Sequence, residues 1–196
     1  MRGIEGLVSV LDTRSFGSVW YWLVLAGLWS WLGRGALGVP TDLVRRVHRR
    51  TRETEAAEDA GAIRAEAMLL LDWLSLVIPR WRVDPRDGVI LTAVAAFLLS
   101  ALAGLGFLYD RQFAQALTLL VAPMALLALM RVRLAARLAR VLAEAEAGRT
   151  GAVPAAAKAA AVMVRHLRGT MALSMAAVAL AAIWGTRWLA LHPNGL

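Results

Sequence analysis

The side chains best able to do chemistry in this chain are three histidines and one aspartate. His48 and His166 lie beside apolar runs rather than inside them, and His192 follows the last run. A haem or a chlorophyll needs an imidazole held within a helix bundle, with partners that fix the orientation of the ring. Asp72 is the carboxylate closest to an apolar environment, and arginines on either side of it can neutralise its charge. We therefore predict no catalytic residues and no bound metal.

Known reaction motifs are missing from the sequence. The chain has no cysteine, which excludes disulfides, thiolate catalysis, and zinc or iron–sulfur clusters held by its own thiolates. It contains no G-x-S-x-G, no H-E-x-x-H and no glycine-rich phosphate loop. No carboxylate lies deep within an apolar run, which counts against a proton-coupled or sodium-coupled transporter. We therefore expect a protein that is not an enzyme and carries no cofactor.

The elements that must position the polar residues are long apolar runs. Of the 196 residues, 59% are hydrophobic, and about 20 consecutive apolar residues are enough for one transmembrane helix. The sequence predicts an all-α integral membrane helical bundle that forms a single membrane domain, residues 1–196, with four transmembrane helices. The expected spans are residues 16–39, 88–109, 112–130 and 169–191.

Basic residues alternate with these runs and so indicate the orientation. Seventeen of the 22 Lys and Arg residues fall within Thr41–Asp87 and Arg131–Arg168, and Arg34 adds one more to the same side. The remaining four are Arg2, Arg14, Arg111 and Arg187. Basic loops resist translocation and stay cytoplasmic. The pattern therefore predicts a multi-pass protein of the bacterial inner (cytoplasmic) membrane with both termini in the periplasm.

One apolar segment between the first two spans is too short to cross a bilayer. Met68–Ile78 has 11 residues, and charged residues flank it on both sides. It predicts an interfacial helix over about residues 64–79, with Trp73 and Trp81 at the level of the lipid headgroups. A crossing at this point would move one terminus to the other side and break the charge pattern.

The third span is expected to continue as a helix beyond the membrane. Arg131–Ala147 is rich in helix formers, Gly148–Pro154 forms a linker, and helix formers resume at Ala155. We therefore predict a cytoplasmic helical hairpin over residues 131–168. This stretch holds eight basic residues against two glutamates, a net charge of +6. It is the strongest candidate docking surface in the sequence.

Basic side chains in two clusters are candidates for binding a protein partner or anionic lipid headgroups. Near an anionic membrane surface each Lys or Arg contributes roughly 1 kcal/mol. Because the charge flanks apolar runs, topology and lipid explain it better than nucleic acid does. A solvated helix with mixed charges is an equally good interpretation of the first cluster. The residues are Arg45, Arg46, Arg49, Arg50, Arg131, Arg133, Arg137, Arg140, Lys158, Arg165 and Arg168.

Small side chains recur at helical spacing in two of the expected spans. Such rows let helix backbones approach closely in lipid. We favour packing within the chain over a dimer interface, although such rows serve both. The rows are Thr92, Ala96, Ser100 and Gly104 in the second span, and Ala177, Ala181 and Gly185 in the fourth.

Half of the eight tryptophans lie in the first expected span. At 100° per residue, Trp20 and Trp31 share one helix face, while Trp22 and Trp29 share the opposite face. We expect this helix to touch lipid or a neighbouring subunit on at least one of these faces. Contact with a pigment or a quinone is a weaker alternative.

Four stretches, which together with their surroundings span most of the chain, carry a resemblance to a known family. They are DTRSFGSVWYWLVLAGLWS from Asp12, LGVPTDLVRR from Leu37, GFLYDRQFAQALTLLVAPMALLALM from Gly106, and AIWG from Ala182. The chain resembles small alphaproteobacterial multi-pass membrane proteins that are often described as a "component of SufBCD complex". The resemblance implies a partner in iron–sulfur cluster assembly. Because the chain has no cysteine to bind a cluster, the implied role is that of a membrane docking platform.

These observations together predict an accessory or scaffold protein of a membrane complex. A small-solute transporter or channel subunit is the alternative. It would need a polar path, for which the spans offer only Thr92, Ser100, Thr118, Ser174 and a few glycines. An enzyme acting on lipid comes third, and it would need a carboxylate or histidine cluster at the cytoplasmic interface, where Asp72 and His166 are the only candidates. The identity of the partner and the oligomeric state stay open at this point.

Overall fold

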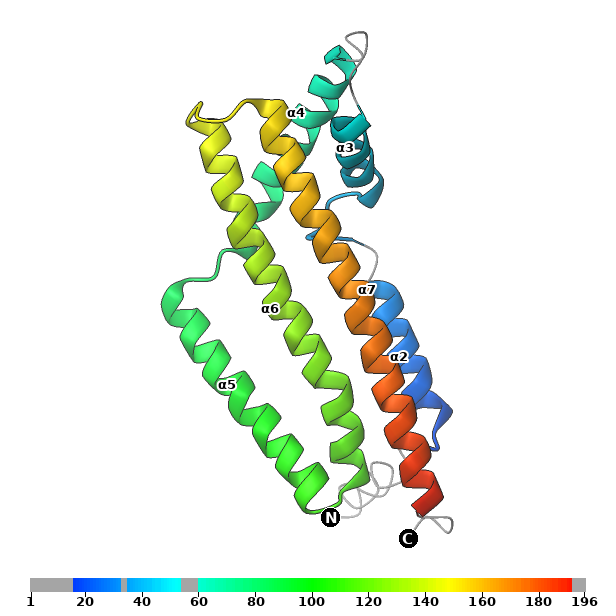
Figure 1. Ribbon diagram of the computed structural model, residues 1–196. Helices are drawn as coiled ribbons and strands as arrows, with labels where there is room; N and C mark the ends of the chain where they lie inside the picture. The colour runs from blue at the N-terminus through cyan, green and yellow to red at the C-terminus, as the bar shows by residue number, and fades with distance from the viewer. Residues whose placement is uncertain (1–15, 33–34, 54–59, 192–196) are drawn as a thin grey trace. The chain divides into compact units, whose positions relative to one another are not determined.

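Helices make up all the longer regular elements in the part of the chain that the structure describes. The structure is a computed structural model, and it describes residues 16–32, 35–53 and 60–191 (Figure 1). The all-α fold class is confirmed for these residues. The helices are α2 (Val19–Leu32), α3 (Thr41–Glu53), α4 (Ala60–Val77), α5 (Pro85–Ala103), α6 (Gln112–Glu146) and α7 (Ala152–Leu191). A 3₁₀ turn (Ile78–Trp81) follows α4, and a π-helical turn (Gly104–Leu108) follows α5.

The chain divides into two compact units where the sequence led us to expect one domain. Unit 1 comprises Met1–Leu32, Pro85–Leu126 and Ala172–Leu196, and unit 2 comprises Gly33–Asp84 and Leu127–Met171. Unit 1 therefore holds α2, α5, the first part of α6 and the last part of α7. Unit 2 holds α3, α4 and the hairpin formed by the remaining parts of α6 and α7.

Three helical segments are long and apolar enough to cross a membrane: Arg86–Leu108, Gln112–Glu146 and Ala152–Leu191. The fourth expected span is not shown. α2 has 14 residues, fewer than the about 20 that a transmembrane helix needs. A helix over the whole of residues 16–39 is also absent, because α2 ends at Leu32 and the chain turns before α3 begins. In this turn Leu37 and Gly38 have φ angles of 60° and 90°, a conformation that glycine adopts without strain.

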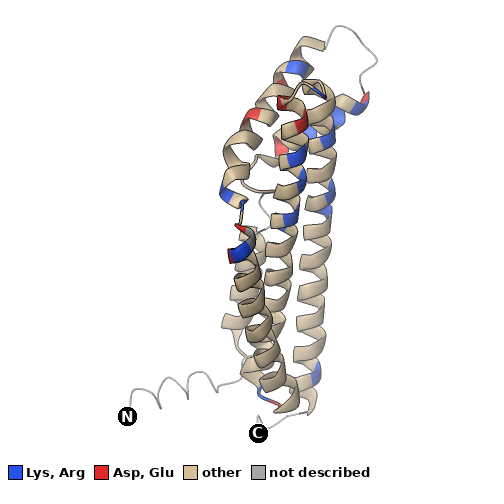
Figure 2. Cartoon of the chain, turned by 90° about the vertical axis from the view of Figure 1, so that its left-hand side faces the viewer, with Lys and Arg blue, Asp and Glu red and all other residues tan. Residues whose placement is uncertain are grey.

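Unit 1 covers little of its own apolar surface. In α5, no described side chain is buried, and Phe97 is 71% exposed. Exposing such a helix to water costs about 25 cal/mol for each Å² of apolar surface, whereas lipid removes this cost. In Figure 2 the helices of unit 1 carry charged residues only near their ends. The coarse prediction of a membrane-embedded helical protein is therefore supported.

Close approaches at two glycines and a hydrogen bond hold unit 1 together. At Gly185 of α7, an added Cβ would lie 3.1 Å from the ring of Phe16, which is itself 1% exposed. The indole nitrogen of Trp22 donates a hydrogen bond to the backbone oxygen of Phe16 at 3.0 Å. At Gly106, an added Cβ would lie 2.8 Å from the backbone nitrogen of Gln115. Glycine thus allows the π-helical turn to touch the start of α6.

Unit 2 has a continuous hydrophobic core. Helix α4 is longer than the expected interfacial helix at residues 64–79, because it begins at Ala60. One of its faces lies in the core, while Leu76 on the other face is 70% exposed. The main contributions to the core come from Leu43, Val44 and Val47 of α3, Ala67, Leu70 and Leu74 of α4, Leu134, Leu138 and Val141 of α6, and Ala155, Ala156, Ala159, Ala160 and Met163 of α7.

The turn of the expected hairpin is shorter than the sequence indicated. Helix α6 ends at Glu146 and α7 begins at Ala152, so Pro154 lies in the first turn of α7, where no helical hydrogen bond is lost. Gly148 has a φ of 68°. Its N–H donates to the oxygen of Ala145, and the N–H of Arg149 donates to the oxygen of Glu144, both at 3.0 Å. This pair of bonds is the Schellman motif that ends many helices at a glycine.

The close approach at Gly106 makes a direct prediction. Replacing Gly106 with Ala should lower the free energy of unfolding in detergent by about 1–3 kcal/mol, because the new methyl group meets backbone atoms that cannot move aside. Gly104→Ala is the matched control in the same turn, since nothing lies within 4 Å of its added Cβ. The control should be neutral or stabilising. Equal thermal unfolding of the two variants would contradict this packing.

Candidate functional site

The first basic cluster lies on a helix with two distinct faces. Leu43, Val44 and Val47 of α3 are buried in the core of unit 2. This arrangement turns the arginines of α3 away from the core, and Arg45 and Arg49 are exposed. The helix is therefore fixed by its apolar face and presents a basic face.

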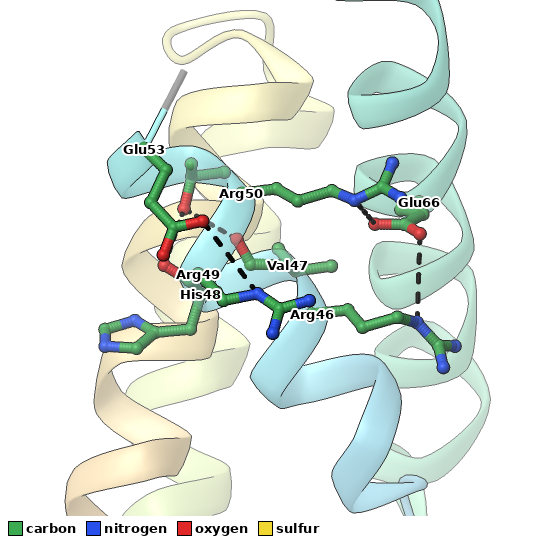
Figure 3. A network of polar contacts seen from close by, with 8 residues as sticks. Arg46, Val47, His48, Arg49, Arg50, Glu53 and Glu66 are labelled. Carbon is green, nitrogen blue, oxygen red and sulfur yellow. Dashed lines mark hydrogen bonds and ion pairs between the residues drawn. The ribbon is translucent and has the colours of Figure 1, made fainter. Parts of the chain in front are cut away.

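Glu66 of α4 joins two of these arginines to the neighbouring helix (Figure 3). Its carboxylate oxygens lie 3.8 Å from Nε of Arg46 and 3.7 Å from Nε of Arg50, and its side chain is 22% exposed. Arg46 and Arg50 stand one helical turn apart, so one carboxylate can meet both. These two predicted binding residues therefore help to hold α3 against α4.

The other arginines of this face make weaker contacts within the protein. Arg49 pairs with Glu53 on its own helix at 3.9 Å, with both side chains about two-thirds exposed. Exposed pairs of this kind contribute little. His48, near this face, has a pKa lowered by partial burial and then by the charges of Arg52 and Arg168. At neutral pH the imidazole is therefore uncharged, which leaves the positive charge of this surface to the arginines.

Lys158 of α7 and Glu144 of α6 form an ion pair between the two arms of the hairpin. Nζ of Lys158 lies 3.0 Å from the carboxylate of Glu144. Arg140, which directly precedes the core residue Val141 on α6, is exposed. The hairpin in unit 2 thus keeps most of its excess positive charge on its surface, as the blue segments in Figure 2 show.

Three arginines line a shallow groove of about 230 Å³ within the hairpin. Arg133 and Arg137 come from α6 and Arg165 from α7. All three arginines are exposed. None of them forms an ion pair with an Asp or Glu of the described part of the chain. The other lining residues are Met130, Leu134, Val162 and His166.

The remaining predicted binding residues lie close to this groove. Arg131, which lies between the lining residues Met130 and Arg133 on α6, is half-buried. Arg168 is exposed and lies one turn beyond Arg165 on α7. His166 is 9% exposed, and the hydroxyl of Thr170 donates to its backbone oxygen at 3.1 Å. This histidine is thus packed between the two arms of the hairpin.

The structure offers no catalytic constellation among the residues it describes. Within that part of the chain, no three His, Cys, Asp or Glu residues are close enough to hold a metal ion. Of the two residues considered for a lipid-directed enzyme, Asp72 is exposed on α4 and His166 is buried on α7. The hydroxyls of Thr92 and Thr118 each donate to a carbonyl four residues earlier in their own helix. Two of the four polar side chains considered for a solute path are thus bound to backbone.

The four tryptophans of the first apolar run differ in solvent exposure according to the helix face on which they lie. Trp20 and Trp31 are 75% and 71% exposed. Trp22 is half-buried and Trp29 is buried. The exposed pair is the one that the helical spacing places on one face, so this face of α2 is free to contact lipid or a second subunit. Arg34 and the residues before Phe16 lie outside the described residues.

The two rows of small side chains have different surroundings. On α7, Ala177, Ala181 and Gly185 are buried within unit 1. On α5, Thr92, Ala96 and Ser100 are exposed. Gly104, the first residue of the π-helical turn after α5, has no atom within 4 Å of an added Cβ. The packing within the chain that we favoured for both rows is therefore present on α7 and lacking for α5 in the described structure.

Gln115 is a buried polar residue that the sequence did not single out. It is 1% exposed. Its amide nitrogen donates to the oxygen of Gly106 at 2.9 Å and to a carboxylate oxygen of Asp110 at 2.8 Å. Its amide oxygen accepts from the indole nitrogen of Trp184 at 3.0 Å. Its role in unit 1 is to connect α7 to the turn between α5 and α6. The sequence signal that could have identified this residue is a glutamine within an otherwise apolar run.

Comparison with known proteins adds no relative: no family model, no curated protein and no solved structure matches this chain. The resemblance to the alphaproteobacterial family therefore stays a prediction.

Glu66 provides a test of how the basic face is held. Changing Glu66 to Gln should lower the free energy of unfolding by about 1 kcal/mol, because two arginines lose one half-buried partner. The matched change, Glu53→Gln, removes an exposed pair on the same surface and should cost less than about 0.5 kcal/mol. Thermal unfolding in detergent at low and high salt measures both. If the two variants unfold alike at low salt, Glu66 does not fix α3 to α4.

Proposed function

We propose that this protein is a non-enzymatic accessory or scaffold protein of the bacterial inner membrane that docks a partner complex through basic cytoplasmic segments. The observation that carries the proposal is the contrast between the two units. Unit 1 exposes apolar helices that only lipid or another apolar surface can cover, whereas unit 2 has its own core and a charged surface. Such a chain can hold a water-facing docking unit at a membrane.

The orientation follows from the charge distribution. Unit 2 contains 17 of the chain's 22 basic residues, nine in its first segment and eight in its second. The positive-inside rule favours the cytoplasm for these segments. In this proposal α2 makes a fourth crossing, so both termini are periplasmic. A span shorter than the hydrocarbon core is accommodated when the bilayer thins locally around it.

The partner surface is proposed to be acidic. Arg45 and Arg49 on α3 and Arg140 on α6 are exposed basic residues of unit 2 outside the arginine groove. Arginine is enriched where proteins bind one another, and complementary charge speeds association. The family resemblance suggests that the partner belongs to the iron–sulfur assembly machinery. Docking, unlike cluster binding, needs no cysteine.

The test is affinity purification of the full chain from native membranes in mild detergent, followed by mass spectrometry. The test variant carries Arg45→Gln, Arg49→Gln and Arg140→Gln. The matched control changes the same three residues to Lys, which keeps the charge. Glutamine rather than glutamate leaves most of the positive-inside signal intact.

We expect a stoichiometric partner with the wild type and with the Lys variant. Its yield with the Gln variant should fall by about tenfold or more, because each charge contributes roughly 1 kcal/mol. A protein that purifies alone in all three forms would contradict the docking function. A partner retained equally by the Gln variant would contradict the proposed surface.

A further inference from the structure

The arginine groove of unit 2, defined by Arg133, Arg137 and Arg165, has a chemistry that differs from the rest of the basic surface. Arg133 and Arg137 stand one turn apart on α6, and Arg165 comes from the facing arm on α7. Guanidinium groups bind phosphate oxygens in pairs, with both geometry and charge matched. Glu144, one of the two acidic residues of the hairpin, is already paired with Lys158. The groove therefore presents three positive charges to one small space.

Apolar side chains complete the groove. Met130, Leu134 and Val162 line it together with the arginines, and Leu134 is 4% exposed. Its volume of about 230 Å³ is below the range of about 300–1,000 Å³ for sites that enclose drug-sized ligands. A phosphate with an apolar neighbour suits this lining better than a free, fully hydrated anion does.

The groove also lies where the apolar runs of both helices end. On α6 no charged residue occurs from Gln112 to Met130, and Arg133 follows three residues later. On α7 the charge-free run begins at Gly169, four residues after Arg165. At 1.5 Å per residue, both arginines are within about 6 Å of these ends along their helices. This is the level at which arginine reaches lipid headgroups.

We propose that the arginine groove binds the phosphate of an anionic phospholipid, with the apolar part of the lipid next to the phosphate lying against Met130, Leu134 and Val162 of the groove. The inference rests on the membrane placement in the proposed function, but it does not depend on the protein partner. Bound lipid would neutralise part of the hairpin and fix its level at the membrane surface. The groove is thus a lipid site, and the partner surface is separate from it.

The test uses the purified full chain in detergent, from which native lipid has been removed, and native mass spectrometry to count bound lipids. The probes are phosphatidylglycerol, phosphatidylcholine and inorganic phosphate. The groove variant carries Arg133→Gln, Arg137→Gln and Arg165→Gln. The matched control is the Arg45→Gln, Arg49→Gln, Arg140→Gln variant, which loses the same charge elsewhere in unit 2.

We expect one phosphatidylglycerol to be retained by the wild type and by the control, with retention by the groove variant weaker by about tenfold or more. Phosphatidylcholine should be retained poorly, and inorganic phosphate should not displace the lipid. Equal loss in the groove and control variants would overturn the inference, because the attraction would then be general. Displacement by inorganic phosphate would also overturn it in favour of a soluble anion.

Two further readouts keep the outcome clear. Thermal unfolding without lipid should be the same for the groove variant and the wild type, since all three arginines are exposed. If the groove variant does not fold, competition between phosphatidylglycerol, phosphatidylcholine and inorganic phosphate for the wild-type protein still tests whether the groove binds lipid. If the protein shows no preference for phosphatidylglycerol but still co-purifies with its partner, the lipid site is overturned and the docking function stands. A lost partner with intact lipid selectivity overturns only the docking function.

Discussion

The uncovered apolar surface of α5 sets the condition under which this fold is stable. The helix buries none of its described side chains in the chain itself, so lipid or another apolar surface must cover it. In lipid the hydrophobic effect no longer drives helices together, and unit 1 is held by shape and polar contacts instead. Gly106 and Gly185 permit close approach, and Gln115 joins three separate segments with hydrogen bonds. An amide bonded in this way leaves no unsatisfied polar group in an apolar environment.

The same two helices serve a different purpose in unit 2. There α6 and α7 meet through leucine, valine and a run of alanines that bury almost completely, as in a water-soluble helical protein. The charges follow from this packing, because residues outside the core face are free to be arginine. Glu66 uses two of these arginines to hold α3. Arg133, Arg137 and Arg165 form no ion pair with a described Asp or Glu, and these three arginines line the groove.

The apolar runs of the sequence predicted where the helices lie better than they predicted which helices contact one another. Three expected spans fall on α5 with its π-helical turn, on the first part of α6 and on the last part of α7, because uninterrupted apolar runs are a strong local signal. The turn at Leu37 and Gly38 was missed, since its apolar residues continue the preceding run while belonging to the core of unit 2. The pairing of Arg46 and Arg50 with Glu66, like the bond between Gln115 and Trp184, joins residues of different helices. Such pairs depend on how helices pack, which spacing along one helix does not reveal.

The central claim is that unit 2 faces the cytoplasm while the turn between α5 and α6 faces the periplasm. Because the chain has no cysteine, single Cys variants report on this directly. Ala147→Cys lies on the exposed end of the hairpin, and Tyr109→Cys lies at the α5–α6 turn. In spheroplasts, a membrane-impermeant maleimide should label the Tyr109→Cys variant at once and the Ala147→Cys variant only after the membrane is permeabilised. Labelling of the Ala147→Cys variant in intact spheroplasts would contradict the account.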